Sequence, residues 1–373
     1  MIQLFSAYIC QEAKDAVANV LDTGWIGQGP KTKQFELEFA GWCGAKYAVA
    51  TSSATAALDL AVKVSDLNLG DEVLTTSMTF VSTNHVLLYN QLVPVFVDID
   101  PKTLNMDLVE IERAITPKTK AIMVVHYGGN PMNLTKLYKL ADAYGLKVIE
   151  DAAHACGARF NERYIGSYGL TCFSFHAVKN LPIGDGGMIT TNDEEVYKRL
   201  LRLRWLGIDK STFDRSSEQG YKWEYDVPEV GYKYAMNDIS AAIGIEQLKY
   251  VDRWNFKRLQ MVAKYASRLP FYFLEETPGA VSSHHLCVIR VHEKERLYAA
   301  CKEEGIELGV HYKPNHFYPM YRQFVREPLP ETEHAYKVIL SLPLHLRLKE
   351  SDLWKVMNVL NKDYSEILWE VME

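Results

Sequence analysis

The sequence predicts an α/β protein with a large domain, built on a mostly parallel sheet, and a smaller α+β domain behind it. Three observations support this prediction. From residue 45 onward, short apolar runs alternate with longer segments of helical periodicity, as in βαβ units. A long helical stretch follows Asn237, and a new set of short strands comes after it. A length of 373 residues also suffices for two such domains.

The strands of the large domain are predicted from apolar runs of five to eight residues. They are expected at 46–51, 72–77, 93–99, 120–127, 146–151, 171–177 and 187–192. Helices are expected between most of these strands, at 53–64, 81–90, 106–115 and 133–144. The last two strands are separated only by a glycine-rich turn. Helices placed in this rhythm cover both faces of a sheet.

The second half of the chain begins with a helical pattern over 238–269, which predicts one long helix or two joined helices. New strands such as "HLCVIRV" follow, and the chain ends in a helix. We therefore expect a large domain over 1–250 and a smaller domain over 251–373.

Composition excludes several classes of protein. The formal charge of −6 provides no general basic field for nucleic acid or an anionic membrane. The N-terminus lacks the basic region of a signal peptide, and no apolar run is long enough to cross a bilayer. The six cysteines form no CxxC pair and have no metal-type spacing. We expect a cytoplasmic protein with reduced cysteines and no metal.

Ligands of open α/β sheets bind beyond the carboxyl ends of the strands, so the residues that follow each strand are candidates. The first strand is followed by Ser52, Ser53, Ala54 and Thr55, which enter a helix. Small residues at a helix N-terminus allow a phosphate to approach free N–H groups. A plain Ser or Thr N-cap is the alternative interpretation.

Two further candidates follow the fifth strand, in "VIEDAAHACGA". Asp151 stands between an apolar strand and small residues, where a carboxylate can bind a ribose, a metal or a protonated ring nitrogen. His154 lies three residues on and is expected to share the face of Asp151 on a helix. Taken alone, His154 is better explained as a structural histidine than as a functional one.

Lys179 ends the apolar segment "FSFHAVK" and is followed by "NLPIGDGG", a stretch able to fold tightly around a ligand. A lysine near a carboxylate, a serine (Ser174) and a helix N-terminus indicates a nucleophile that forms a Schiff base. Pyridoxal 5′-phosphate (PLP) needs this set of an amine, an acid and a phosphate cradle. The glycine motifs of dinucleotide-binding and P-loop proteins are absent.

Six motifs follow one another over nearly the whole chain. They are "SSATAAL", "TTSMTFVSTNHV", "EDAAHACGA", "FSFHAVKNLPIGDGG", "GYKYAMNDISAAIG" and "VHYKPNHFYPMY". With these motifs in this order, the chain resembles the DegT/DnrJ/StrS family of sugar aminotransferases, which are PLP-dependent enzymes of fold type I, the aspartate aminotransferase fold.

The resemblance implies a role for each matched position. Lys179 matches the lysine that forms the Schiff base and then moves the proton, and Asp151 matches the acid paired with the pyridine nitrogen. His154 matches the residue near the 3′-oxygen of the cofactor, and Phe80 matches the aromatic residue that stacks on the ring. Ala54, Thr55 and Ser174 match the phosphate cradle. Tyr312 and His316 match positions that contact the substrate. The region 205–226 matches a variable substrate loop of the family.

Two segments depart from the family pattern. Lys233 and Ala235 replace an asparagine and an arginine in "GYKYAM". The family asparagine reaches the phosphate in the neighbouring subunit, and a lysine can serve there as a point charge. The residues His176, Ala177 and Val178 before the lysine also differ. The dehydratase branch of the family has histidine at the position of Lys179, so the lysine favours amino transfer.

The resemblance thus implies a homodimeric aminotransferase that moves an amino group from L-glutamate to a keto sugar. The expected acceptor is a nucleotide-linked 3- or 4-keto sugar, and the product would enter amino-sugar or surface polysaccharide biosynthesis. A PLP-dependent sugar dehydratase and a non-catalytic regulator that kept the fold are the alternatives.

Overall fold

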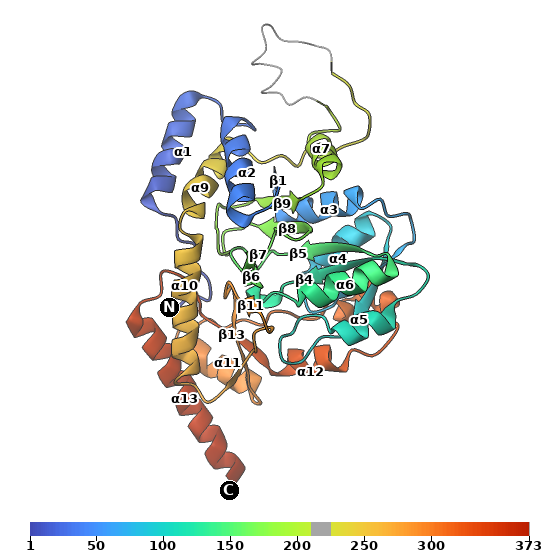
Figure 1. Cartoon of the computed structure of the whole chain (residues 1–373). Coiled ribbons are helices and arrows are strands. Elements are labelled where there is room, and N and C mark those ends of the chain that lie inside the picture. Colours follow the sequence, from blue (N-terminus) through green and yellow to red (C-terminus); the bar gives the residue numbers. More distant parts are fainter. Residues whose placement is uncertain (210–224, 373) are drawn as a thin grey trace.

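A seven-stranded sheet forms the centre of the protein (Figure 1). The structure is a computed structural model that describes residues 1–209 and 225–372, with side chains up to residue 362. The strand order is β1(Tyr47–Thr51), β9(Gly187–Thr191), β8(Leu170–Ser174), β5(Lys147–Asp151), β4(Thr119–Val125), β2(Glu72–Thr76) and β3(Val93–Val97). Strands β8, β5, β4, β2 and β3 run parallel, whereas β9 is antiparallel to both β8 and β1. This confirms the predicted mostly parallel sheet.

Helices cover both faces of this sheet and thereby bury its strands on both sides. One core cluster joins the sheet to α2(Pro30–Cys43), α6(Leu134–Tyr144) and α9(Asp238–Leu248). A second cluster, on the opposite face, joins it to α3(Ala54–Val64), α4(Val81–Tyr89) and α7(Glu194–Leu203). Helix α5(Leu108–Ala114) contributes the buried Ile111 to the first cluster, and α1(Gln11–Thr23) packs on α9.

The predicted helix over 238–269 is two helices. Helix α9 ends at Leu248, and α10(Val251–Ala266) begins two residues after Lys249. The N–H of Tyr250 bonds the Gln247 carbonyl at 3.0 Å, so a single tight turn joins the two axes. Figure 1 shows α10 leading from the large sheet to the second part of the chain.

The C-terminal part forms its own small layer. A three-stranded antiparallel sheet joins β10(Tyr272–Phe273), β12(Cys287–Arg290) and β13(Ile339–Leu342). The helices around it are α11(Lys294–Glu303), α12(Pro330–Val338) and α13(Glu350–Met372). A third sheet pairs β11(Ala280–Val281) with β6(Arg159–Phe160) and β7(Arg163–Tyr164).

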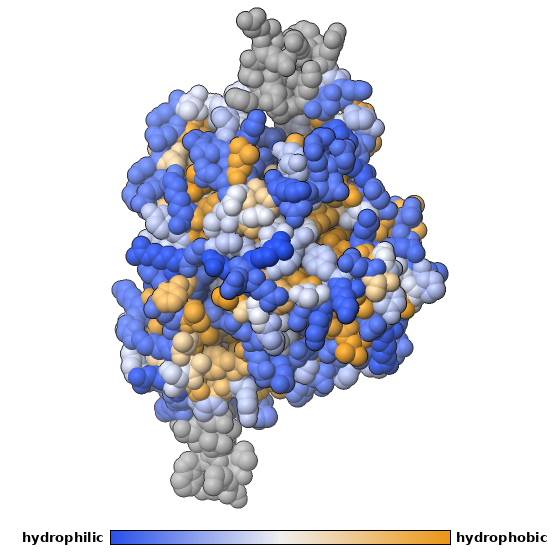
Figure 2. Space-filling view, viewed as in Figure 1, coloured by the Kyte–Doolittle hydropathy of each residue, from blue (hydrophilic) through white to orange (hydrophobic). Residues whose placement is uncertain are grey.

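The N-terminal residues belong spatially with this C-terminal layer. Ile2 pairs with Ile306, and its side chain joins the core of the small sheet. The first residues of the chain thus pack with the part that follows residue 250. The domain limits of 1–250 and 251–373 stay a prediction. In the described part of the chain, no helix combines the length and apolar character needed to span a bilayer. Hydrophilic residues cover most of the face in Figure 2, with apolar residues in separate groups.

Candidate active site

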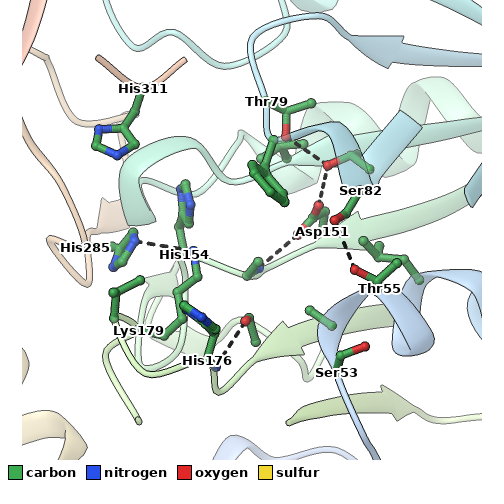
Figure 3. A pocket seen from close by; sticks show the side chains of 18 of the residues that line it. Ser53, Thr55, Thr79, Ser82, Asp151, His154, His176, Lys179, His285 and His311 are labelled. Atoms are coloured by element: carbon green, nitrogen blue, oxygen red, sulfur yellow. Dashed lines mark hydrogen bonds between the residues drawn. The ribbon is translucent and has the colours of Figure 1, made fainter. Parts of the chain in front are cut away.

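A cavity of about 330 Å³ opens at the carboxyl edge of the sheet (Figure 3). Val125, Asp151 and Ser174, the last residues of β4, β5 and β8, all line it. Its size lies within the range of small-molecule sites. The predicted position of the site at the carboxyl ends of parallel strands thus coincides with a cavity.

The N-terminus of α3 forms one wall of the cavity. Ser53 is the N-cap, and its hydroxyl accepts a hydrogen bond from Ala56 N at 3.1 Å. Ala54 and Thr55 occupy the first turn and line the cavity, and the first N–H groups of a helix have no acceptor within it. The Thr55 hydroxyl donates to Ser82 Oγ at 3.0 Å. The wall therefore presents backbone and hydroxyl groups suited to an anion.

Gly187 allows this wall to lie directly against the sheet. A Cβ built on Gly187 would stand 2.5 Å from the Ser53 carbonyl oxygen and 2.8 Å from Ala54 N. Both neighbours are backbone atoms that cannot move without moving the start of α3. The third glycine of "GDGG" is thus required for packing, because only a residue without a side chain lets β9 lie this close to the predicted anion site.

Asp151 is buried at the floor of the cavity. Its Oδ2 accepts from the Thr83 hydroxyl at 2.7 Å, and its Oδ1 accepts from Ala153 N at 3.0 Å. Burial raises the pKa of this carboxyl, and the Thr83 bond, the Ala153 bond and the charge of Lys179 act in the opposite direction. A carboxylate that is so desolvated gains most from a further cationic donor.

Lys179 lies in the same cavity, but not on a strand. The predicted strand over 171–177 ends at Ser174, and Lys179 N bonds the His176 carbonyl at 2.8 Å in the turn that follows. Burial lowers the pKa of Lys179 to about 8, although Asp151 raises it. A larger share of this amine is thus neutral near pH 7 than of an exposed lysine, as a nucleophile requires.

His154 stands in a turn, which corrects the expectation that a helix follows Asp151. Its Nδ1 accepts from Gly128 N at 3.3 Å, so the proton of the neutral ring is assigned to Nε2. That nitrogen lies 2.9 Å from the Tyr312 hydroxyl, which therefore accepts. Burial keeps the pKa of His154 well below its usual value. The Tyr312 O–H, rather than the His154 ring, is left to donate into the cavity.

The remaining predicted residues divide into two groups. Phe80 lines the cavity, and its ring centroid lies 6.2 Å from that of Tyr312. Lys233 and His316 are not among the lining residues. Lys233 is exposed, with its Nζ 3.3 Å from the Trp205 ring centroid, and His316 is buried against the Ser77 hydroxyl at 2.7 Å. Their roles stay predictions, and residues 210–224 of the expected substrate loop lie outside the described residues.

Sequence reasoning missed two histidines beside Lys179. His285 Nε2 lies 3.5 Å from Lys179 Nζ (Figure 3), and His311 lines the same cavity. Burial lowers the pKa of His285 well below its usual value and that of His311 to about 4. The pair "HH" before the strand "LCVIRV" was the available signal for His285, but only long-range packing brings it to the lysine.

Comparisons with known proteins identify the family of the chain. The model of the DegT/DnrJ/EryC1/StrS aminotransferase family matches residues 7–361. The chain belongs to this aminotransferase family, and its fold is fold type I of the PLP-dependent transferases.

Individual relatives match over nearly their whole length. The chain is 39% identical over 365 residues to the spore coat polysaccharide biosynthesis protein SpsC of Bacillus subtilis, with 92% of each chain covered. It is 34% identical to AtS13 of Actinomadura melliaura, with a TM-score of 0.90 and 97% and 98% of the two chains covered. It is 30% identical to Spr1654 of Streptococcus pneumoniae in its PMP form, with a TM-score of 0.92 and 98% and 100% covered.

Proposed function

We propose that the protein is a PLP-dependent aminotransferase that moves an amino group from L-glutamate to a keto sugar. The proposed acceptor is a nucleotide-linked 3- or 4-keto sugar, used in amino-sugar or surface polysaccharide biosynthesis. The observation that carries the proposal is the meeting of Lys179, Asp151 and the N-terminus of α3 in one cavity. The name of SpsC, a protein of polysaccharide biosynthesis, supports the proposed pathway class.

The chemistry of the donor set fits PLP. Its phosphate would be held by the N–H groups of Ala54 and Thr55 and by the Ser174 hydroxyl, all of which line the cavity. Asp151 would face the ring nitrogen, and Phe80 would cover the ring. When bound, PLP supplies a carbonyl for the amino donor and a ring that accepts electrons. A protonated ring nitrogen is the cationic donor that the buried Asp151 carboxylate lacks.

The residues themselves perform the proton steps. Lys179 Nζ lies at the end of a flexible side chain in the cavity, and its lowered pKa allows it to take a proton from a substrate carbon and return it to a neighbouring atom. The hydrogen bonds from Thr83 and Ala153 favour the anionic form of Asp151 and oppose the burial that raises its pKa. The Tyr312 hydroxyl can donate to an oxygen of the cofactor or substrate.

We further propose a homodimer with shared sites. Among the described residues that line the cavity, Lys179 is the only lysine or arginine, so the phosphate has no cation of its own. Lys233 is exposed, and a cation–π contact at an exposed site contributes only about 0.5–1 kcal/mol, so its amine is easily released from Trp205. Val227 and Val230 nearby are 51% and 88% exposed, which suits a surface covered by a second copy.

The test begins with the purified protein. It should be yellow, and borohydride should fix the cofactor to the peptide that contains Lys179. Glutamate alone should convert the cofactor to its pyridoxamine form with one equivalent of 2-oxoglutarate released per site. A screen of keto sugars, read by mass, should then find an aminated product.

Other outcomes lead to different conclusions. Label on another lysine would refute the assignment of Lys179. If other amino acids but not glutamate bleached the yellow colour of the cofactor, only the assignment of glutamate as the amino donor would be rejected. Loss of a sugar hydroxyl without amination would establish the dehydratase, and a protein without cofactor would establish the regulator.

A further inference from the structure

A buried chain of amide groups leads to Lys179. Asn180, the next residue, is buried, and its Nδ2 donates to Asn255 Oδ1 and to the Ser283 carbonyl, each at 2.7 Å. Asn255 Nδ2 in turn donates to the Cys156 carbonyl at 2.9 Å. Because both N–H groups of the Asn180 amide are used, its orientation is determined, and its Oδ1 faces the other way.

This orientation sets the proton of His285. The Asn180 Oδ1 can only accept, and it lies 3.0 Å from His285 Nδ1, so Nδ1 carries the proton. The ring is neutral because burial lowers its pKa. Its Nε2 therefore presents a lone pair, and Lys179 Nζ lies 3.5 Å from it as a donor. His154 has the opposite tautomer, although the two ring centroids are only 4.4 Å apart.

The His285 ring is held on every side. Its backbone N–H bonds the Gly128 carbonyl at 3.0 Å, which ties it to the turn after β4. The Phe5 ring stacks on it with centroids 5.6 Å apart and planes within 8°. The ring is buried, so neither it nor its proton can readily exchange partners with water. A group this constrained acts as a rigid acceptor.

We propose that His285 is a positioning residue for Lys179, whose Nε2 lone pair holds the lysine amine whenever that amine is not bonded to the cofactor. This role rests on the proposed function, because the amine is released in each half-reaction of an aminotransferase. The amine gives one N–H to His285 and keeps its lone pair for the substrate proton. Without this acceptor, the four-carbon side chain would sample other rotamers at the moment when proton transfer needs a defined geometry.

The acceptor also affects the charge of the amine. A hydrogen bond to the ammonium form favours that form, so removal of His285 Nε2 should lower the pKa of Lys179. The other titratable groups that line the cavity come from several segments. They are Asp151 from β5, His154 from the turn after it, His176 and Asp185 on either side of Lys179, and His311 with Tyr312 from the segment before η2(Asn315–Phe317). These groups are unchanged by substitution of His285.

The test compares three substitutions. His285→Asn keeps a donor for Asn180 but has no group at the position of Nε2. His285→Gln carries an acceptor that reaches Lys179. His284→Asn is the matched control, because the adjacent His284 points away from the cavity, with its Nε2 3.3 Å from Glu276. Its φ of 47° lies in the left-handed region, which asparagine tolerates.

The measurement is the pH dependence of acetylation of Lys179 in the full chain freed of cofactor, followed by peptide mass spectrometry. Wild type and His284→Asn should show a midpoint near pH 8. His285→Asn should move it down by about one pH unit, or ~1.4 kcal/mol, and His285→Gln should restore most of the shift. With cofactor bound, His285→Asn should slow the glutamate half-reaction about tenfold or more, with glutamate affinity little changed.

An unchanged midpoint in His285→Asn would overturn the proposal, as would an equal shift in His284→Asn. If His285→Asn does not fold, His285→Leu, which also lacks an acceptor at this position, takes its place: a lowered midpoint supports the role, and an unchanged midpoint opposes it. The labelling needs no catalysis. Failure of the proposed function would appear instead as a wild-type protein that binds no PLP or ignores glutamate.

Discussion

Burial of Lys179 should make the cofactor-free protein less stable than its own Lys179→Met variant. The lysine keeps an amine in a desolvated cavity, and methionine replaces it with an apolar chain of similar length. The pKa falls from its ordinary 10.5 to about 8, and this difference corresponds to roughly 3 kcal/mol of unfolding free energy. The substitution should therefore raise the free energy of unfolding by up to about 3 kcal/mol at pH 7.

The sign of the pH dependence follows from proton binding. Between pH 8 and 10.5 the folded lysine is largely neutral while the unfolded lysine remains protonated, so the unfolded state binds more protons and stability rises with pH. Below pH 8 the lysine is charged in both the folded and the unfolded state, and burial of its charge then destabilises the folded state to the full extent. The gap between variant and wild type should thus be constant below about pH 7 and close as pH rises through 8 toward 10.5.

Urea titrations of both proteins at a series of pH values measure this gap. Taking the difference between the two proteins removes the contribution of the shared titrating groups that do not interact with Lys179. Lys198→Met serves as the control, because Lys198 is a surface lysine paired with Glu194 and Glu195. A gap of the same size at pH 7 and pH 10.5, or a less stable Lys179→Met at pH 7, would refute the reasoning.

Three further predictions concern the site. Asp151→Asn keeps the shape but removes the charge, and should slow turnover by roughly 3–5 kcal/mol in barrier height; a near-normal single-turnover rate would assign that role to another group. Gly187→Ala forces its Cβ against Ser53 and should cost about 1–3 kcal/mol of stability and weaken PLP binding, as equilibrium dialysis would show; unchanged affinity would contradict the close packing. Mixing inactive Lys179→Ala and Lys233→Ala subunits should regain activity through one intact site per heterodimer, whereas no gain would argue against shared sites.

The local pattern of the sequence was sufficient for most of the fold. Periodicity and small residues at turns indicated the βαβ rhythm, and the structure places a strand at each predicted position of the large sheet. Their ends were less certain, because the pattern of 171–177 stays apolar beyond Ser174, where the ladder to β9 stops. Hydrogen-bond partners, rather than side-chain polarity, ended that strand.

The same division holds for the site. Asp151, Lys179 and the start of α3 could be identified from the sequence because each follows a strand, and the carboxyl ends of parallel strands meet at one edge. His154 lies in a turn rather than in the expected helix. The backbone N–H of Gly128 donates to its Nδ1 and thereby sets the tautomer of the ring. No local pattern encodes such a partner.

The sequence by itself indicated the candidate residues of the site, since an amine, a carboxylate and a helix N-terminus are properties of single residues and short segments. Tertiary structure alone decided what surrounds them. His285 lies 106 residues after Lys179 and meets it only because the segment before β12 bonds the turn after β4. His316, close to Tyr312 in the chain, turns instead to Ser77. Contacts over such separations depend on how whole layers pack, and the burial they produce lowers the pKa of the lysine.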